Sequence, residues 1–216
     1  MKHTTTNFIP RWLLSRLTQS DMPYGGDAIF VLAGGQDRKR FGLELFRQGL
    51  APRILLSVGR FEIRRFAPLV QCRSVDLLRI AADIPPPQRH FFVDFHGTET
   101  EVRWIRPRLP GTLCEMKAFR KWLGENGDVT SVLIVSSAMH LRRLRACALA
   151  LFPREVNLRF SAVPTGFTAG ASHGAAEAET PSWRPILLEC LKLAIYRTML
   201  DTRLSGLNRL VGLGQS

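Results

Sequence analysis

Two uninterrupted apolar runs, separated by a helical stretch, constrain the fold of this chain more than any other feature. The first, DAIFVLA, ends at Gly34 and Gly35, and the second, RILLSVG, ends at Gly59. Runs of this length without polar alternation are typical of strands buried on both faces of a sheet. Between them, apolar residues such as Phe41 and Leu45 recur at helical spacing. The pattern predicts a βαβ unit with parallel strands and a right-handed crossover.

The rest of the chain continues this alternation. In order, the patterns predict a mainly helical stretch at 61–82 divided by Pro68, a strand at 90–95, a loop or short hairpin at 96–111, a helix at 112–123, a strand at 131–136 followed by a basic helix, a strand at 156–163, and a helix at 183–200. We therefore predict a three-layer Rossmann-like α/β sandwich with a mostly parallel sheet of about five strands.

A length of 216 residues suits one α/β domain with a full core. We expect an N-terminal arm at 1–26, the domain itself at 27–200 and a C-terminal tail at 201–216. Within the domain, residues 164–181 are rich in Gly, Ala, Ser and Thr and show neither a helical nor a strand period. That composition predicts a mobile loop.

The chain is strongly basic, with 30 Lys and Arg against 18 Asp and Glu and a formal net charge of +12. Such a surface attracts anions, and the candidates are phosphorylated small molecules, anionic lipid headgroups and nucleic acid. The absence of interleaved basic and aromatic residues counts against nucleic acid as a partner. A solvated basic surface without a specific partner is the other interpretation. The sequence indicates no oligomeric state.

Cysteine spacing and apolar segments bear on the compartment. The four cysteines are widely spaced and form no C-x-x-C pair, which favours reduced thiols and the cytosol; they are Cys72, Cys114, Cys147 and Cys190. Pro10, Arg11 and Arg16 break the apolar residues of the N-terminal arm, and a spanning helix needs about 20 apolar residues. We expect a cytoplasmic protein and leave peripheral membrane contact open.

Polar residues and glycines follow the predicted strands, and parallel strands form a ligand crevice at their carboxyl ends. These residues are Gly34, Gly35, Ser57, Gly59, Asp94, Ser136, Ser137 and His140. The Gly34-Gly35 turn leads into a helix, so its backbone amides and the helix N-terminus favour an anion. Arg38 or Arg40 would add charge-assisted contacts. The alternative is a plain tight turn, because the motif is neither G-x-G-x-x-G nor a Walker loop.

The stretch SSAMHLRR, which follows the strand at 131–136, is the most informative. Ser137 is placed to cap the next helix, and His140 and Arg143 follow at helical spacing on the same side. A hydroxyl, an imidazole and a guanidinium would then converge at a helix N-terminus, which makes an anion site with a proton carrier. A capped amphipathic helix with exposed basic residues is the structural alternative.

Other motifs are less specific. Thr112 and Glu115 have the spacing of a capping box that opens a helix, which favours a structural role, and Thr98 and Glu101 repeat that spacing in the preceding loop. The histidines and carboxylates match no standard metal pattern, so we predict no metal site; they are His90, His96, His140, Asp94, Glu99 and Glu101. The chain contains no G-x-S-x-G elbow that would support a serine nucleophile.

Taken in order, these pieces resemble the YdcF-like proteins of the domain-of-unknown-function 218 family. The matching segments are DAIFVLAGG, Arg38 with Gly49, APRILLSVG, Thr112 with Glu115, SSAMHLRR, and Trp183 with Glu189, and they run from Asp27 to about Tyr196. The departures are Ser57-Val58-Gly59 for Ser-Gly-Gly, Met116 for Asn, and Ser136 for Thr. Whether the pair at 112 and 115 or the pair at 98 and 101 takes the family's T-x-E-N place is open.

The resemblance implies a Rossmann-like sheet with a polar crevice. In one branch of the family it implies binding of S-adenosylmethionine. In other branches it implies a membrane tether and a link to envelope integrity and to peptidoglycan or lipid-carrier metabolism. The family has no firmly assigned reaction. This chain is more similar to the first branch, because its sequence shows no tether.

We therefore hypothesise a protein that binds an anionic, phosphate-bearing or nucleotide-like small molecule at the strand ends, and that hydrolyses or transfers it if it is an enzyme. His140 is the predicted proton carrier and Glu115 a second polar wall. The predicted ligand contacts are Gly34, Gly35, Arg38, Ser57, Gly59, Thr112, Ser136, Ser137 and Arg143. The alternatives are a non-catalytic S-adenosylmethionine or nucleoside module and a basic scaffold on an anionic membrane. No acidic residue is evident at the end of the second strand, which counts against a nucleoside site.

Overall fold

The structure is a computed structural model that describes residues 20–23, 25–66, 69, 75–106, 111–152, 155–167, 187–196 and 198. Several predictions lie outside the described residues, namely those for 1–19, Pro68, Cys72, 168–181, Trp183 and 201–216. Within the described ranges Cys114, Cys147 and Cys190 are free thiols.

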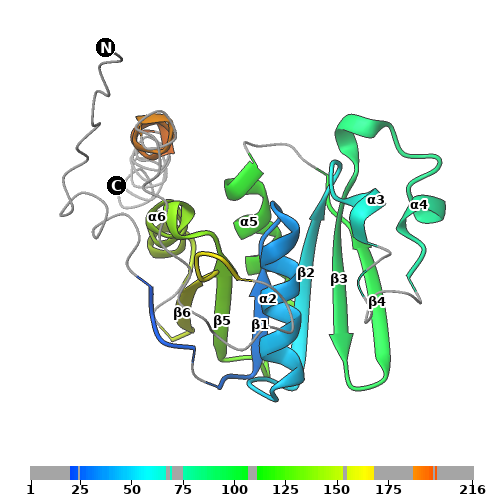
Figure 1. Cartoon of the computed structure of the whole chain (residues 1–216), viewed down its shortest axis with the longest axis horizontal. Helices are drawn as coiled ribbons and strands as arrows, with labels where there is room; N and C mark the ends of the chain where they lie inside the picture. The colour runs from blue at the N-terminus through cyan, green and yellow to red at the C-terminus, as the bar shows by residue number, and fades with distance from the viewer. Residues whose placement is uncertain are drawn as a thin grey trace, which may run out of the picture.

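The fold is built on a six-stranded sheet in the order β4-β3-β2-β1-β5-β6 (Figure 1). Its strands are β1 (Ala28–Val31), β2 (Arg53–Gly59), β3 (His90–His96), β4 (Glu99–Trp104), β5 (Ser131–Ser136) and β6 (Asn157–Ala162). β1, β2, β5 and β6 are parallel, whereas β3 is antiparallel to β2 and β4 is antiparallel to β3. The predicted α/β sandwich with a mostly parallel sheet is confirmed, with six strands instead of about five.

Helices cover both faces of this sheet. α2 (Gln36–Arg47) lies on one face, and α5 (Gly111–Glu125) and α6 (Leu141–Leu151) lie on the other. Short helices are α3 (Ile63–Phe66), α4 (Leu77–Ile80), η2 (Pro86–Gln88) and η3 (Ala138–His140). A further helix at 187–196 adds Tyr196 to the core on the α6 face. None of the helices within the described ranges is long and apolar enough to cross a membrane.

The continuous apolar run of β1 reflects burial on both faces. Ile29 and Val31 pack in the cluster under α2, whereas Ala28 and Phe30 pack in the cluster under α5 and α6. Phe30 stacks on Phe119 of α5 at a ring distance of 4.2 Å. A strand with two buried faces has no room for polar alternation, and this is why the pattern identified it.

The prediction that Asp94 lies at the crevice required β3 to be parallel to β2. In the structure β3 runs antiparallel to β2. Of the predicted helical stretch at 61–82, the described residues form only α3 and α4, with four residues each. A parallel crossover usually runs through a long helix, whereas α3 and α4 are single turns and the chain returns antiparallel beside β2. Asp94 therefore lies toward the opposite edge, where Arg53 (2.6 Å) and the Trp122 indole (2.8 Å) donate to its carboxylate. The placement of Asp94 at the crevice is wrong.

The stretch at 96–111 contains the hairpin that the sequence left as one option. β3 and β4 pair from His96 opposite Glu99 to Phe91 opposite Trp104. The connecting turn lies at the edge where β2 begins. Thr98 and Glu101 consequently lie away from the crevice.

Helix α2 packs very closely on β1. A Cβ at Gly42 would lie only 2.3 Å from Cγ2 of Val31, a residue without solvent exposure. The missing side chain therefore lets the helix approach the strand, and this approach fixes the position of the turn between them.

We expect Gly42→Ala to destabilise the protein by about 1–3 kcal/mol, because Val31 has no space to move away in a packed core. Gly124→Ala is the matched control, since Gly124 is also helical and nothing lies within 4 Å of its Cβ position. That change should be neutral or stabilising by up to about 1 kcal/mol. Urea unfolding measures both effects, and equal stability of the two variants would contradict the close packing.

Candidate functional site

The chain changes sides at β1, which is where an open α/β sheet forms a crevice. After β1 it passes through α2 on one face to β2, whereas β5, on the other side of β1, leads into α6 on the opposite face. The segments that follow β1 and β5 therefore diverge at the carboxyl edge (Figure 1). Gly34 and Gly35 belong to the first segment, and Ser137 and His140 belong to the second.

Arg38 bridges these two segments. Its Nη1 donates to the carbonyl oxygen of Ala33 (2.5 Å), and its Nη2 contacts Ser137 Oγ (2.9 Å) and His140 Nδ1 (2.5 Å). The guanidinium lies against Gly34, where φ is +147° and a Cβ would come within 2.4 Å of Nη1. Gly34 thus makes room for Arg38. Ser137 occupies the predicted N-cap position, before η3, but its side chain makes no capping bond, because its hydroxyl accepts from Arg38.

Arg38 is a buried cation whose hydrogen-bond partners within the described ranges are all neutral groups. The residue is 7% exposed, and no ion pair among the described residues includes it. Burial lowers the pKa of Arg38, and the charges of Glu115 and Glu62, which it does not contact, raise it. The three bonds above use three of the five N–H donors of a guanidinium.

His140 links Arg38 to Glu189. Because a guanidinium only donates, His140 Nδ1 accepts from Arg38, which places the ring proton on Nε2. Nε2 lies 3.3 Å from Glu189 Oε1. Burial lowers the pKa of His140, as do the charges of Arg38 and Arg143, while Glu189 opposes them. The imidazole is therefore held neutral in one tautomer.

Glu189, in the helix at 187–196, is the carboxylate on which this group converges. Its Oε2 accepts from Arg143 Nη1 (2.6 Å) and its Oε1 accepts from Lys192 Nζ (2.9 Å). Burial would raise the pKa of Glu189, but hydrogen bonds from His140 and Lys192 and the charge of Arg143 outweigh burial and lower the pKa to about 2. Arg143 is thus ion-paired, although its buried Nε has no partner among the described residues.

A second polar cluster lies at the end of β2. Glu115 Oε1 accepts from the Ala33 N–H (2.8 Å) and from the Ser57 hydroxyl (2.6 Å), and Ser57 Oγ lies 2.8 Å from His90 Nε2. Ser57 is fully buried. The capping-box interpretation is wrong, because Thr112 lies inside α5 and the Glu115 carboxylate turns toward β1 and β2.

His90 comes to this cluster through the reversed direction of β3. It is the first residue of that strand and pairs with Gly59, the last residue of β2. Burial lowers the pKa of His90, and the charge of Glu115 opposes this. A strand that begins at the crevice contributes its first residue to the site, so His90 takes the place that was predicted for Asp94.

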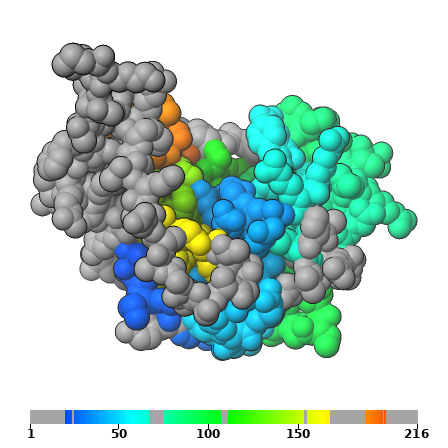
Figure 2. All heavy atoms as spheres, in the orientation of Figure 1, coloured from blue at the N-terminus to red at the C-terminus, as the bar shows by residue number. Residues whose placement is uncertain are grey.

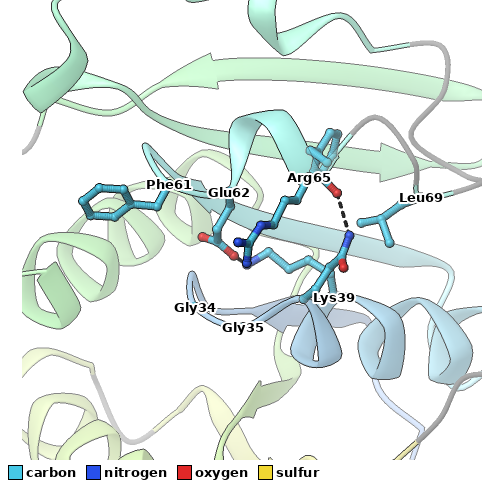
Figure 3. A pocket seen from close by; sticks show the side chains of 9 residues that line it. Gly34, Gly35, Lys39, Phe61, Glu62, Arg65 and Leu69 are labelled. Atoms are coloured by element: carbon cyan, nitrogen blue, oxygen red, sulfur yellow. Dashed lines mark hydrogen bonds and ion pairs between the residues drawn. The ribbon is translucent and has the colours of Figure 1, made fainter.

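A cavity of about 250 Å³ opens beside the Gly34-Gly35 turn, on the side of β2. It lies between the N-terminal part of α2, drawn in blue in Figure 2, and the segment that contains α3, drawn in cyan. Lys39 and Glu62 line it and point toward one another (Figure 3). The buried Lys39 Nζ donates to the Leu32 carbonyl (2.9 Å) and to Glu62 Oε1 (2.7 Å). This ion pair joins the ends of β1 and β2.

The structure places the predicted site residues in two groups at the carboxyl edge. Arg38, Ser137 and His140 are in direct contact in one group, and Ser57 and Glu115 are in direct contact in the other. The remaining predicted contacts are Gly34, Gly35 and Gly59 at the strand ends, Arg143 paired with Glu189, Thr112 in the first turn of α5, and Ser136, whose buried Oγ has no partner within the described residues. In that part of the chain no group of His, Cys, Asp and Glu could hold a metal ion.

Four polar residues at this edge were not among the predicted contacts: Lys39, Glu62, His90 and Glu189. Glu189 appeared only in the family pattern. Glu62 follows β2 by three residues, and that position could have drawn attention to it. Lys39 carried no signal in the sequence, and His90 had been considered only as a metal ligand.

The fold and these residues define a class: a doubly wound α/β domain with an arginine-centred polar site at the carboxyl edge of its sheet. Comparisons with known protein families, with curated proteins and with solved structures returned no match. The resemblance to a family therefore stays an expectation from the sequence, and the function is inferred from the site.

The His140 pKa tests the geometry of the first group. We expect it to lie below the usual value of about 6.5 for histidine, and we expect Glu189→Gln to lower it further, because the amide removes the negative charge that favours the imidazolium. Lys192→Gln, which removes a cation from the same carboxylate, should not lower it. An NMR titration of the ring measures all three proteins. An unchanged or higher pKa in Glu189→Gln would show that the contact is absent.

Proposed function

We propose that this protein binds an anionic, phosphate-bearing or nucleotide-like small molecule at the crevice between the Gly34-Gly35 turn and the segment that contains Ser137 and His140. The observation that carries the proposal is that Arg38 is a buried cation without an ion-pair partner among the described residues. Burying a charge is costly unless the charge is paired, and among the described residues this guanidinium contacts neutral acceptors only. An anion at this place would supply the missing charge partner.

The start of helix α2 supports the same proposal. Gly35 is its N-cap, and nothing lies within 4 Å of the position of a Cβ there. The space above the turn is therefore open, and the N-terminus of a helix of 12 residues favours negative charge. Arg38 and the helix N-terminus would act on a phosphate group from neighbouring positions.

Catalysis would require a change at His140. Its side chain is 28% exposed, but Nδ1 accepts from Arg38 and Nε2 faces Glu189. A ligand that draws the Arg38 guanidinium toward itself would free Nδ1 to take a proton from an attacking hydroxyl or water, and Glu189 would stabilise the resulting imidazolium. Hydrolysis or transfer at a phosphate is the reaction that fits. A link to cell-envelope metabolism is suggested by the family resemblance alone.

One observation favours the alternative of a binding module without catalysis, for S-adenosylmethionine or another nucleoside. Both ring nitrogens of His140 already have protein partners. A histidine held on both sides in this way is suited to positioning Arg38.

Arg38→Met should weaken the binding of inorganic phosphate and pyrophosphate at least about tenfold, because a hydrogen bond to a charged group contributes about 1.5–3 kcal/mol. Arg40→Met is the matched control, since Arg40 lies two residues further along the same helix and is exposed. Calorimetry on both variants measures the affinities. Equal losses in the two variants would indicate a diffuse effect of the basic surface and would refute the site.

His140→Ala separates catalysis from binding. If the protein is an enzyme, phosphate release from a panel of phosphomonoesters and diphosphates should fall about a hundredfold or more in this variant, while phosphate still binds. A fully active variant would exclude His140 as the proton carrier. Binding without any release by the wild-type protein would favour the binding module.

A further inference from the structure

A carboxylate lies at the end of β2, where the sequence showed no acidic residue. Glu62 follows the strand by three residues and folds back, so that its Oε2 accepts from the Gly59 N–H (2.9 Å) and its Oε1 from Lys39 (2.7 Å). In doubly wound folds, a carboxylate at this place binds the hydroxyls of a ribose. The earlier argument against a nucleoside site, the absence of an acid at this strand end, is therefore wrong.

Glu62 has the capacity to bind further donors. A carboxylate offers about four acceptor positions, and the two hydrogen bonds above use one on each oxygen. The side chain is 16% exposed and lines the cavity (Figure 3). Its two oxygens match the two hydroxyls of a vicinal diol. Because Lys39 neutralises the carboxylate, a phosphate nearby is not strongly repelled.

The cavity adjoins the proposed anion site across the Gly34-Gly35 turn. Gly34 lines the cavity and also lies against the Arg38 guanidinium. The charge of Glu62 also acts on Arg38. A volume of about 250 Å³ is below the range of about 300–1,000 Å³ for pockets that hold drug-sized ligands. The space therefore suits one sugar ring more than a whole dinucleotide.

We infer that the cavity holds the sugar of a phosphorylated sugar, free or as part of a nucleotide, with its vicinal hydroxyls on Glu62 and its phosphate at Arg38. This inference rests on the proposed function and adds the class of ligand. Phe61 and Phe66 also line the cavity and supply apolar surface for the ring.

The first test uses the wild-type protein and needs no variant. Calorimetry compares ribose 5-phosphate with 2-deoxyribose 5-phosphate, and AMP with 2′-deoxy-AMP. In at least one pair the ribo compound should bind about tenfold more tightly or better, because the deoxy compound lacks one hydrogen bond to a charged group. A preference confined to the first pair identifies a free sugar phosphate, and a preference confined to the second identifies a nucleotide.

The second test assigns the preference to Glu62. Glu62→Gln should bring the ratio of ribo to deoxy affinity toward one while inorganic phosphate still binds. Glu44→Gln is the matched control, because it removes a carboxylate from the Glu44–Arg47 ion pair at the opposite end of α2, and it should keep the ratio. If Glu62→Gln does not fold with Lys39 left unpaired, the double variant Lys39→Met with Glu62→Gln removes both charges together.

Two failures are distinguishable. Phosphate binding with equal affinities for the ribo and deoxy compounds would overturn the role of the cavity and leave the proposed function intact. No binding of any phosphate compound would overturn both. A preference that persists in Glu62→Gln, or in the double variant, would also overturn the inference, since the diol would then be held elsewhere.

Discussion

The carboxyl edge of this sheet depends on one buried guanidinium. Arg38 reaches from the first turn of α2 back to the carbonyl oxygen of Ala33 and across to Ser137 and His140. It therefore ties together the two segments that diverge after β1 and β5. The close approach of α2 to β1 at Gly42 and the missing side chain at Gly34 make this reach possible. The close packing of α2 on β1 is therefore a condition for the contacts of Arg38, because its guanidinium reaches Ser137 and His140 only when the helix lies close to the strand.

The carboxylates around Arg38 are arranged so that each is held by other groups. Glu189 accepts from Arg143 and Lys192, Glu62 pairs with Lys39, and Glu115 accepts from Ser57 and Ala33. These charges lower the cost of burying the guanidinium without contacting it. Arg38 thus remains the cation with neutral neighbours. Under the proposed function, this local arrangement would provide the selectivity for an anion, whereas the net charge of the chain would act on any anion at a distance.

The sequence predicted the parallel strands because burial on both faces leaves an unmistakable apolar run. It could not predict the direction of β3, which depends on the connection at 61–82. Apolar spacing there resembled a helix, yet the described part forms only the short helices α3 and α4. This one reversal exchanged the two ends of β3, so that Asp94 was assigned to the crevice and His90 was considered only as a metal ligand. Arg38 and His140 were found because they lie next to strands whose direction was right.

The run Arg38-Lys39-Arg40 shows why a run of charges in the sequence does not by itself identify a binding site. Such a run is usually a solvated basic face, but consecutive residues of a helix point about 100° apart. Arg38 consequently turns toward β5, Lys39 turns toward β2 and its partner Glu62, and Arg40 remains in solvent. The first two lie on either side of the Gly34-Gly35 turn. One short basic segment therefore supplies a cation to each side of this turn, Arg38 at the proposed anion site and Lys39 at the cavity beside Glu62, and a ligand of the proposed kind would contact both sides.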